Sequence, residues 1–161
     1  MIKSPIGQLN LDAMTNAFKD LELQLDADVL VFFGEIVDGI EANIKQIVEQ
    51  ICSDEQKHDK LCILLTTPGG SLNPVKRMVN IFRHFYTEVD FIIPDYAYSA
   101  GTVMACSGDK IYMDYYSVLG PIDPQVRNRD GKYVAALGYL DKINELIEKA
   151  KNNELTKGVS R

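Results

Sequence analysis

Short apolar runs alternate with amphipathic segments along most of this chain, and this alternation restricts the possible folds more than any other feature. The run Leu61–Leu65 is almost continuously apolar, which is typical of a strand in a parallel sheet that is covered on both faces. We predict strands at Val29–Phe33, Leu61–Leu65, Val89–Ile93, Ile111–Met113 and Val118–Leu119. We predict helices at Leu9–Leu23, Ile40–Ile51, Asn73–Tyr86, Ala100–Cys106 and from about Val134 to Lys151. Because such strands and helices are joined by right-handed crossovers, the predicted fold class is α/β with a mostly parallel sheet.

Two turns that follow predicted strands carry residues suited to chemistry. The first is Thr-Thr-Pro-Gly-Gly-Ser, which contains Gly69 and Gly70, and the second is Tyr-Ser-Ala-Gly-Thr, in which Ser99 stands directly before a helix. A serine there either caps the helix, which stabilises it by about 1 kcal/mol, or acts as a nucleophile. A glycine turn nearby can offer a backbone N–H to an oxyanion, which favours acyl transfer. A phosphate-binding loop is excluded, because no lysine follows the second glycine directly.

The order of these motifs resembles a known superfamily. DADVLVFFGEI, LLTTPGG, YSAGT and SVLGPIDPQ together resemble the Clp protease/crotonase superfamily, and within it the serine dehydrogenase proteinase (SDH) and SppA-like serine peptidases. The resemblance extends over roughly Asp28 to Lys149. It implies a single Clp/crotonase-like domain, a ββα superhelix, and a serine peptidase that acts on peptides or proteins. The residues that it assigns are Ser99 as nucleophile, Gly70 and Ala100 as the backbone donors of the oxyanion hole, and Gly69 and Ser71 in substrate binding.

The same resemblance also assigns the general base, which is a lysine and not a histidine. His58 and His84 both precede Ser99, and we expect both in solvated positions: His58 in a charged run, and His84 opposite the apolar stripe of its helix. SppA-type peptidases use a lysine from a later helix, and a lysine can deprotonate serine when burial lowers its pKa. The resemblance implies Lys142 as this base, with Lys132 as the second candidate.

Length and charge define the general type of protein. The 161 residues support one domain, which we divide into an N-terminal helical segment at 1–27, a peptidase domain at 28–151 and a polar tail at 152–161. The net charge of −6 argues against a nucleic-acid partner, whose phosphates require clustered lysine and arginine. No run approaches the roughly 18 apolar residues of a membrane span.

The cysteines bear on the compartment. Cys52, Cys62 and Cys106 are odd in number and lack metal-site spacing, and Cys62 and Cys106 lie in apolar runs where we expect core positions. We therefore expect a cytoplasmic protein without metal or cofactor.

Three functions fit these observations. The first is a peptidase with a Ser-Lys dyad, which we expect to form a homo-oligomer, since superfamily relatives assemble and the segment Tyr112–Ile122 is rich in apolar residues. The second is an acyl-CoA enzyme of the crotonase branch, although no basic residues cluster around either motif to hold CoA phosphates. The third is a catalytically silent assembly or binding module, which the absence of a suitable histidine would permit.

Overall fold

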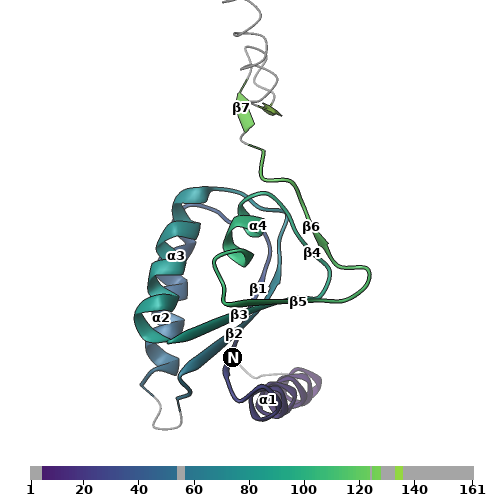
Figure 1. The fold of residues 1–161 in the computed structure, drawn as a ribbon. Coiled ribbons are helices and arrows are strands. Elements are labelled where there is room, and N and C mark those ends of the chain that lie inside the picture. Colours follow the sequence, from purple (N-terminus) through teal and green to yellow (C-terminus); the bar gives the residue numbers. More distant parts are fainter. Residues whose placement is uncertain (1–4, 54–56, 124, 128–132, 136–161) are drawn as a thin grey trace, which may run out of the picture. The chain divides into compact units, whose positions relative to one another are not determined.

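The chain divides into two compact units, Met1–Ile122 and Asp123–Arg161. The computed structural model describes residues 5–53, 57–123, 125–127 and 133–135, with side chains described for 12–53 and 57–123 (Figure 1). The predicted tail at 152–161 and the lysines Lys132 and Lys142 lie outside the described residues.

A four-stranded parallel sheet forms the centre of the first unit. Its strands are β1 (Asp28–Phe33), β2 (Lys60–Thr66), β3 (Glu88–Ile93) and β5 (Lys110–Met113). Their order is β1-β2-β3-β5, and every neighbouring pair is parallel. The predicted α/β fold with a mostly parallel sheet is therefore confirmed.

Two helices cover one face of this sheet (Figure 1). They are α2 (Ile40–Ile51) and α3 (Leu72–Phe85), and they contact each other. Each buries one apolar stripe at helical spacing, so the period of the sequence predicted both helices within a residue or so of their ends. The stripe of α2 includes Ile44 and Val48, and that of α3 includes Val75, Met78 and Phe82.

The sheet residues that face these helices make up most of the core. The register places Leu30, Ile63 and Phe91 side by side on β1, β2 and β3, and all three are buried. On the other face, β1 exposes apolar side chains: Val31 is 45% exposed and Phe33 is 82% exposed. One side of the sheet is therefore sealed by helices, whereas the other is only partly covered by the described residues.

A smaller two-stranded parallel sheet lies beyond the carboxyl ends of the main strands. It pairs β4 (Tyr96–Ala97) with β6 (Val118–Leu119), and the short helix α4 (Ala100–Ala105) follows β4 directly. An isolated bridge between Thr67 and Ala97 connects it to the residue just after β2. This connection brings the two glycine-containing turns of the sequence together.

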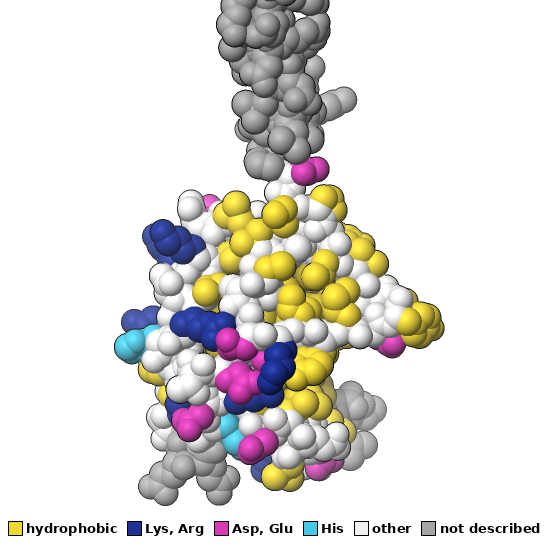
Figure 2. Space-filling view, viewed as in Figure 1, with side chains coloured by type: hydrophobic (Ala, Val, Ile, Leu, Met, Phe, Trp, Pro, Cys, Tyr) yellow, Lys and Arg dark blue, Asp and Glu magenta, His cyan; other side chains and the backbone are white. Residues whose placement is uncertain are grey.

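Charged residues cross the amino ends of β2, β3 and β5. Asp90 is fully buried and forms an ion pair with Lys60 at 2.9 Å, which raises the pKa of Lys60 above its usual range. Lys110 lies 2.7 Å from Glu88, and this contact lowers the pKa of Glu88. Figure 2 shows a mixed cluster of acidic and basic side chains beside a larger hydrophobic area. The cationic neighbour offsets part of the cost of burying Asp90, whose two carboxylate oxygens have no hydrogen-bond partner among the described residues.

The N-terminal helix α1 (Pro5–Leu25) agrees with the predicted amphipathic helix. From residue 12 onward it is largely exposed, with Met14 57% and Leu23 79% exposed, while Phe18 and Leu21 are half-buried. Only part of the predicted apolar stripe is therefore covered by described residues. None of the helices in the described part of the chain is both long and apolar enough to cross a membrane.

One predicted helix and one predicted core position are wrong. The helix expected from Val134 begins instead as a strand, because β8 (Tyr133–Ala135) pairs antiparallel with β7 (Gln125–Arg127) in the second unit. The three-residue strands were too short to show an alternating pattern, and residues 136–151 of that predicted helix lie outside the described residues. Cys106 is exposed, since it follows the last residue of α4, whereas Cys62 is buried as expected, and burial raises its pKa to about 11.

Candidate functional site

The first turn of the candidate site leaves β2 and is held by the segment after β1. The carbonyl of Gly69 accepts a hydrogen bond from the N–H of Ile36 at 2.8 Å, and the carbonyl of Ile36 accepts one from the N–H of Ser71 at 2.8 Å. These two bonds form a parallel bridge between Ile36 and Gly70. In such a bridge the N–H of Gly70 itself points away from Ile36. It forms no hydrogen bond with any described residue.

Both glycines of this turn require the absence of a side chain. Gly70 has a φ of 141°, and a Cβ there would overlap the carbonyl oxygen of Ile36. Gly69 has a φ of 98°, and a Cβ there would lie 3.0 Å from the Cβ of Ser99 and 3.3 Å from the nitrogen of Ala100. Close approach therefore explains the Gly-Gly pair, and it shows that the turn lies directly against Ser99.

Thr67 connects this turn to the second one. Its Oγ1 accepts a hydrogen bond from the N–H of Gly69 at 3.0 Å, and the side chain is completely buried. Its backbone pairs with the residues on either side of Ala97. A Cβ at Gly101 would overlap the methyl group of Thr67, so Gly101 lets α4 approach this residue closely.

Ser99 lies at the start of α4 in an unusual backbone conformation. Its φ of 51° and ψ of −116° lie outside the regions that L-residues prefer. Its side chain makes no capping hydrogen bond, so it does not act as an ordinary helix cap. The hydroxyl, half-buried, has no hydrogen-bond partner among the described residues. Strained residues of this kind gather at active sites, where the surrounding structure fixes them.

Two backbone N–H groups next to Ser99 remain uncommitted within the described part of the chain. One belongs to Gly70 and the other to Ala100, the first residue of α4, which has no partner inside its helix. Both adjoin Ser99, Ala100 in sequence and Gly70 through the contact of Gly69. Donors of this kind can stabilise an oxyanion that forms when a neighbouring hydroxyl attacks a carbonyl.

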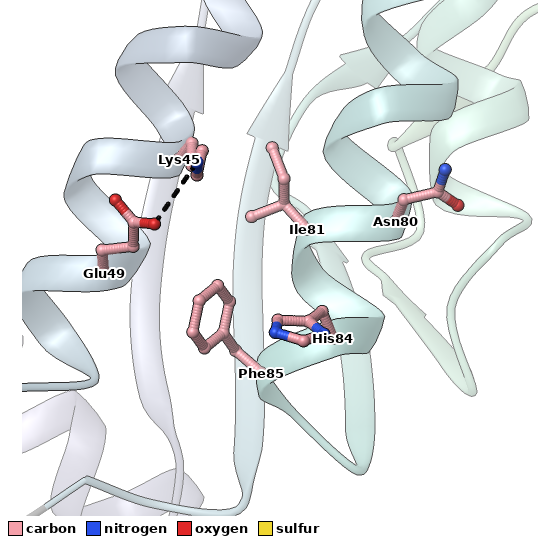
Figure 3. Close-up of a pocket in the computed structure, with 6 residues that line it drawn as sticks. All are labelled: Lys45, Glu49, Asn80, Ile81, His84 and Phe85. Carbon is pink, nitrogen blue, oxygen red and sulfur yellow. Dashed lines mark ion pairs between the residues drawn. The ribbon is translucent and has the colours of Figure 1, made fainter.

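No basic side chain forms a hydrogen bond with Ser99 among the described residues. His84 is exposed on α3, as predicted, and it lines an open pocket of about 400 Å³ between α2 and α3. Figure 3 shows this pocket, which contains the surface ion pair of Lys45 and Glu49 and no residue of the two turns.

His58 is not in the solvated position that the sequence predicted. Its Nδ1 lies 2.8 Å from Oδ1 of Asp28, a buried carboxylate that also accepts a hydrogen bond from the hydroxyl of Tyr86. Burial and, second, the hydrogen bond to Asp28 raise the pKa of Tyr86. The cluster joins β1, the end of α3 and the segment before β2 at the amino ends of the strands, away from the turn after β2. Neither histidine therefore takes the place of a base for Ser99.

The structure adds residues to the site that sequence reasoning missed. Ile36 and Thr67 fix the glycine turn through backbone and hydroxyl bonds, and Thr102 bonds to the carbonyls of Ala97 and Gly120. In the sequence, only the positions of Thr67 and Thr102 beside the two glycine motifs pointed to a role in the site. Nothing in the sequence pointed to Ile36, because a single residue in an isolated bridge shows no periodic pattern.

Comparison with known proteins is consistent with this geometry. Residues 35–151 match the family described as ClpP-like SDH-type serine proteinase. Two uncharacterized proteins of Methanocaldococcus jannaschii are 37% and 35% identical to this chain over 79 and 74 residues. These segments cover 49% and 46% of this chain but only 26% and 24% of the relatives. The chain thus spans about a quarter of the length of the curated relatives that it matches.

Solved structures share the fold. Two structures of the membrane-bound stomatin-specific protease 1510-N give TM-scores of 0.57 and 0.56 at 20% and 22% identity. One is a serine-to-alanine variant, and the other is a lysine-to-alanine variant in complex with a substrate peptide. Each alignment covers 67% of this chain, and 53% or 50% of the other chain. The Clp-like protease fold is therefore shown, and the match over residues 35–151 places this chain in the family of ClpP-like SDH-type serine proteinases.

Proposed function

We propose that this protein is a serine peptidase that hydrolyses peptide bonds with Ser99 as its nucleophile. The observation that carries the proposal is the position of Ser99 directly against a Gly-Gly turn, with a strained backbone and a hydroxyl that does not cap the helix. Membership of a family of serine proteinases supports the same reaction. Peptides as substrates are supported by the substrate peptide that one similar structure contains.

The proposed reaction assigns one role to each group. The hydroxyl oxygen of Ser99 attacks the peptide carbonyl, and its proton passes to a neutral lysine, for which we propose Lys142 and, second, Lys132. The N–H groups of Gly70 and Ala100 donate to the oxyanion. The lysine then protonates the leaving amine as the C–N bond breaks, and water releases the acyl group from Ser99 by the reverse sequence. Gly69 and Ser71 remain proposed substrate contacts.

Covalent labelling with a fluorophosphonate tests both the nucleophile and the base. We expect a single modified residue, Ser99, and a labelling rate that rises with pH as a lysine loses its proton. Lys142→Ala is expected to lower the rate by about 10²-fold or more, in the range of a lost general base. The matched controls are Lys45→Ala, a surface lysine, and His84→Ala, and both are expected to label at the wild-type rate.

The outcomes of this experiment separate the candidate functions. Absence of labelling, in a protein that is folded, would favour a crotonase-type acyl-CoA enzyme or a catalytically silent module. If His84→Ala were labelled slowly and Lys142→Ala at the wild-type rate, the base would be a histidine and not a lysine. Loss of labelling in Lys132→Ala alone would move the role of base to the second candidate.

We also propose that the protein forms a homo-oligomer. The described residues near β5 and β6 leave a group of apolar side chains exposed, and exposed patches of this kind usually mark interfaces. The group consists of Tyr112, Met113, Tyr115, Tyr116 and Val118. Light scattering at micromolar concentration is expected to give a multiple of the 18.1 kDa chain mass. A fully active species of 18.1 kDa would contradict this proposal.

A cytoplasmic location stays a prediction. Its support is the sequence argument from the odd number of cysteines, and all three are free.

A further inference from the structure

Thr102 donates its side-chain hydrogen bond outside its own helix. Its Oγ1 lies 2.8 Å from the carbonyl oxygen of Ala97 and 2.9 Å from that of Gly120, and the residue is 8% exposed. A helical threonine usually bonds to a carbonyl three or four residues earlier in the helix. Here the acceptors are five residues earlier and 18 residues later. Because a hydroxyl carries one hydrogen, it is shared between the two carbonyls.

The two acceptors belong to the segments that surround Ser99. Ala97 ends β4 two residues before Ser99, and its carbonyl also accepts the N–H of Gly120 at 2.9 Å. Gly120 follows β6, and a Cβ at this position would lie 2.5 Å from Cδ1 of Tyr98, the residue before Ser99. The hydroxyl of Thr102 therefore joins β4, α4 and the segment after β6 at one buried point.

These contacts explain how the strain at Ser99 is maintained. The bond from Thr102 to Ala97 connects a residue after Ser99 with a residue before it, so it opposes a relaxation of the chain at Ser99. A residue with a positive φ persists only when its surroundings fix it. We propose that Thr102 is a positioning residue of the peptidase, whose buried hydroxyl holds the Ser99 turn and the Gly120 segment in the reactive arrangement. This inference rests on the proposed function.

Two substitutions at this position test the inference. Thr102→Val keeps the shape and removes the hydroxyl, and Thr102→Ser keeps the hydroxyl. We expect Thr102→Val to lower kcat for a peptide substrate at least ~10-fold with little change in KM, because small displacements of a nucleophile are costly. Thr102→Ser is expected to stay within about 3-fold of the wild type in kcat, because the hydroxyl is retained. Thr87→Val is the matched control, since Thr87 is exposed and its hydroxyl bonds to the carbonyl of Asp59.

A second readout does not depend on activity. Amide hydrogen exchange at Gly120 is expected to be faster in Thr102→Val and unchanged in Thr102→Ser, because the N–H of Gly120 donates to the same carbonyl of Ala97. If the wild type hydrolyses no peptide, the proposed function fails, and this exchange rate alone decides on the positioning.

Three results would overturn the inference. One is a Thr102→Val variant with the kcat of the wild type, and another is an unchanged exchange rate at Gly120 in that variant. The third is a Thr102→Ser variant that loses as much kcat as Thr102→Val, since the hydroxyl would then not be the cause. If Thr102→Val does not fold, Thr102→Ser decides, and a loss of more than ~10-fold in its kcat counts against the inference.

Discussion

Replacing Ser99 by alanine is expected to abolish peptide hydrolysis, with a loss of about 10⁵-fold or more in kcat, as for the removal of other serine nucleophiles. The folded structure should remain, because the hydroxyl caps no helix and has no hydrogen-bond partner among the described residues. The free energy of unfolding is therefore expected to change by no more than about 0.5 kcal/mol, as for substitutions that remove no contact. Peptide hydrolysis followed by mass spectrometry, together with thermal unfolding, measures both quantities.

Ser53→Ala provides the control for this experiment. Ser53 is exposed after α2, and its hydroxyl bonds locally to the carbonyl of Gln50. Its variant should hydrolyse peptides at the wild-type rate. A Ser99→Ala protein that cleaved the same substrate as fast as the wild type would show that another residue attacks the peptide.

The long helices and the central strands were predictable because each carries a pattern of apolar residues that extends over several positions. The apolar stripe of α2 repeats over Ile40–Ile51, and the continuous apolar run of β2 agrees with its position between two parallel neighbours. β4 was missed because its two residues show no alternating pattern, whereas the equally short β6 was predicted from its two apolar residues. For the same reason Tyr133–Ala135 was taken for the start of a helix, although it pairs antiparallel with β7.

The identity of the candidate nucleophile followed from the sequence, but its conformation did not. Serine before a small-residue helix predicts a cap as readily as a nucleophile. Gly69 lies directly against Ser99, while Thr67 and Gly120 contact the residues just before it, and all three come from distant segments of the chain. No local pattern encodes such contacts, so only the structure shows that Ser99 makes no capping hydrogen bond.

The glycine turn was recognised, yet its geometry was also beyond the sequence. The bridge between Ile36 and Gly70 depends on where the segment after β1 runs. This bridge directs the N–H of Gly70 away from Ile36 and leaves it uncommitted within the described part of the chain. The same bridge explains why no side chain fits at Gly70.

Substituting Gly70 by alanine should therefore lower kcat, because it displaces the N–H of this residue. The new Cβ would overlap the carbonyl oxygen of Ile36, so the turn must move away from the segment after β1 and carry its N–H with it. Loss of one oxyanion donor lowers kcat by about 10²–10³-fold, and we expect a loss of that size with KM less affected. Unfolding should also become easier by about 1–3 kcal/mol, since alanine is strained at a φ of 141°.

Gly34→Ala separates strain from displacement of the donor. Gly34 has a similar φ of 132°, but a Cβ there would meet nothing within 4 Å, so this variant should share the loss of stability and keep its kcat. Steady-state kinetics and thermal unfolding of both variants give the comparison. If Gly70→Ala kept the kcat of Gly34→Ala, the N–H of Gly70 would not stabilise the transition state. The oxyanion would then be stabilised by the N–H of Ala100 and by groups outside this turn, because displacement of the N–H of Gly70 would have had no effect on kcat.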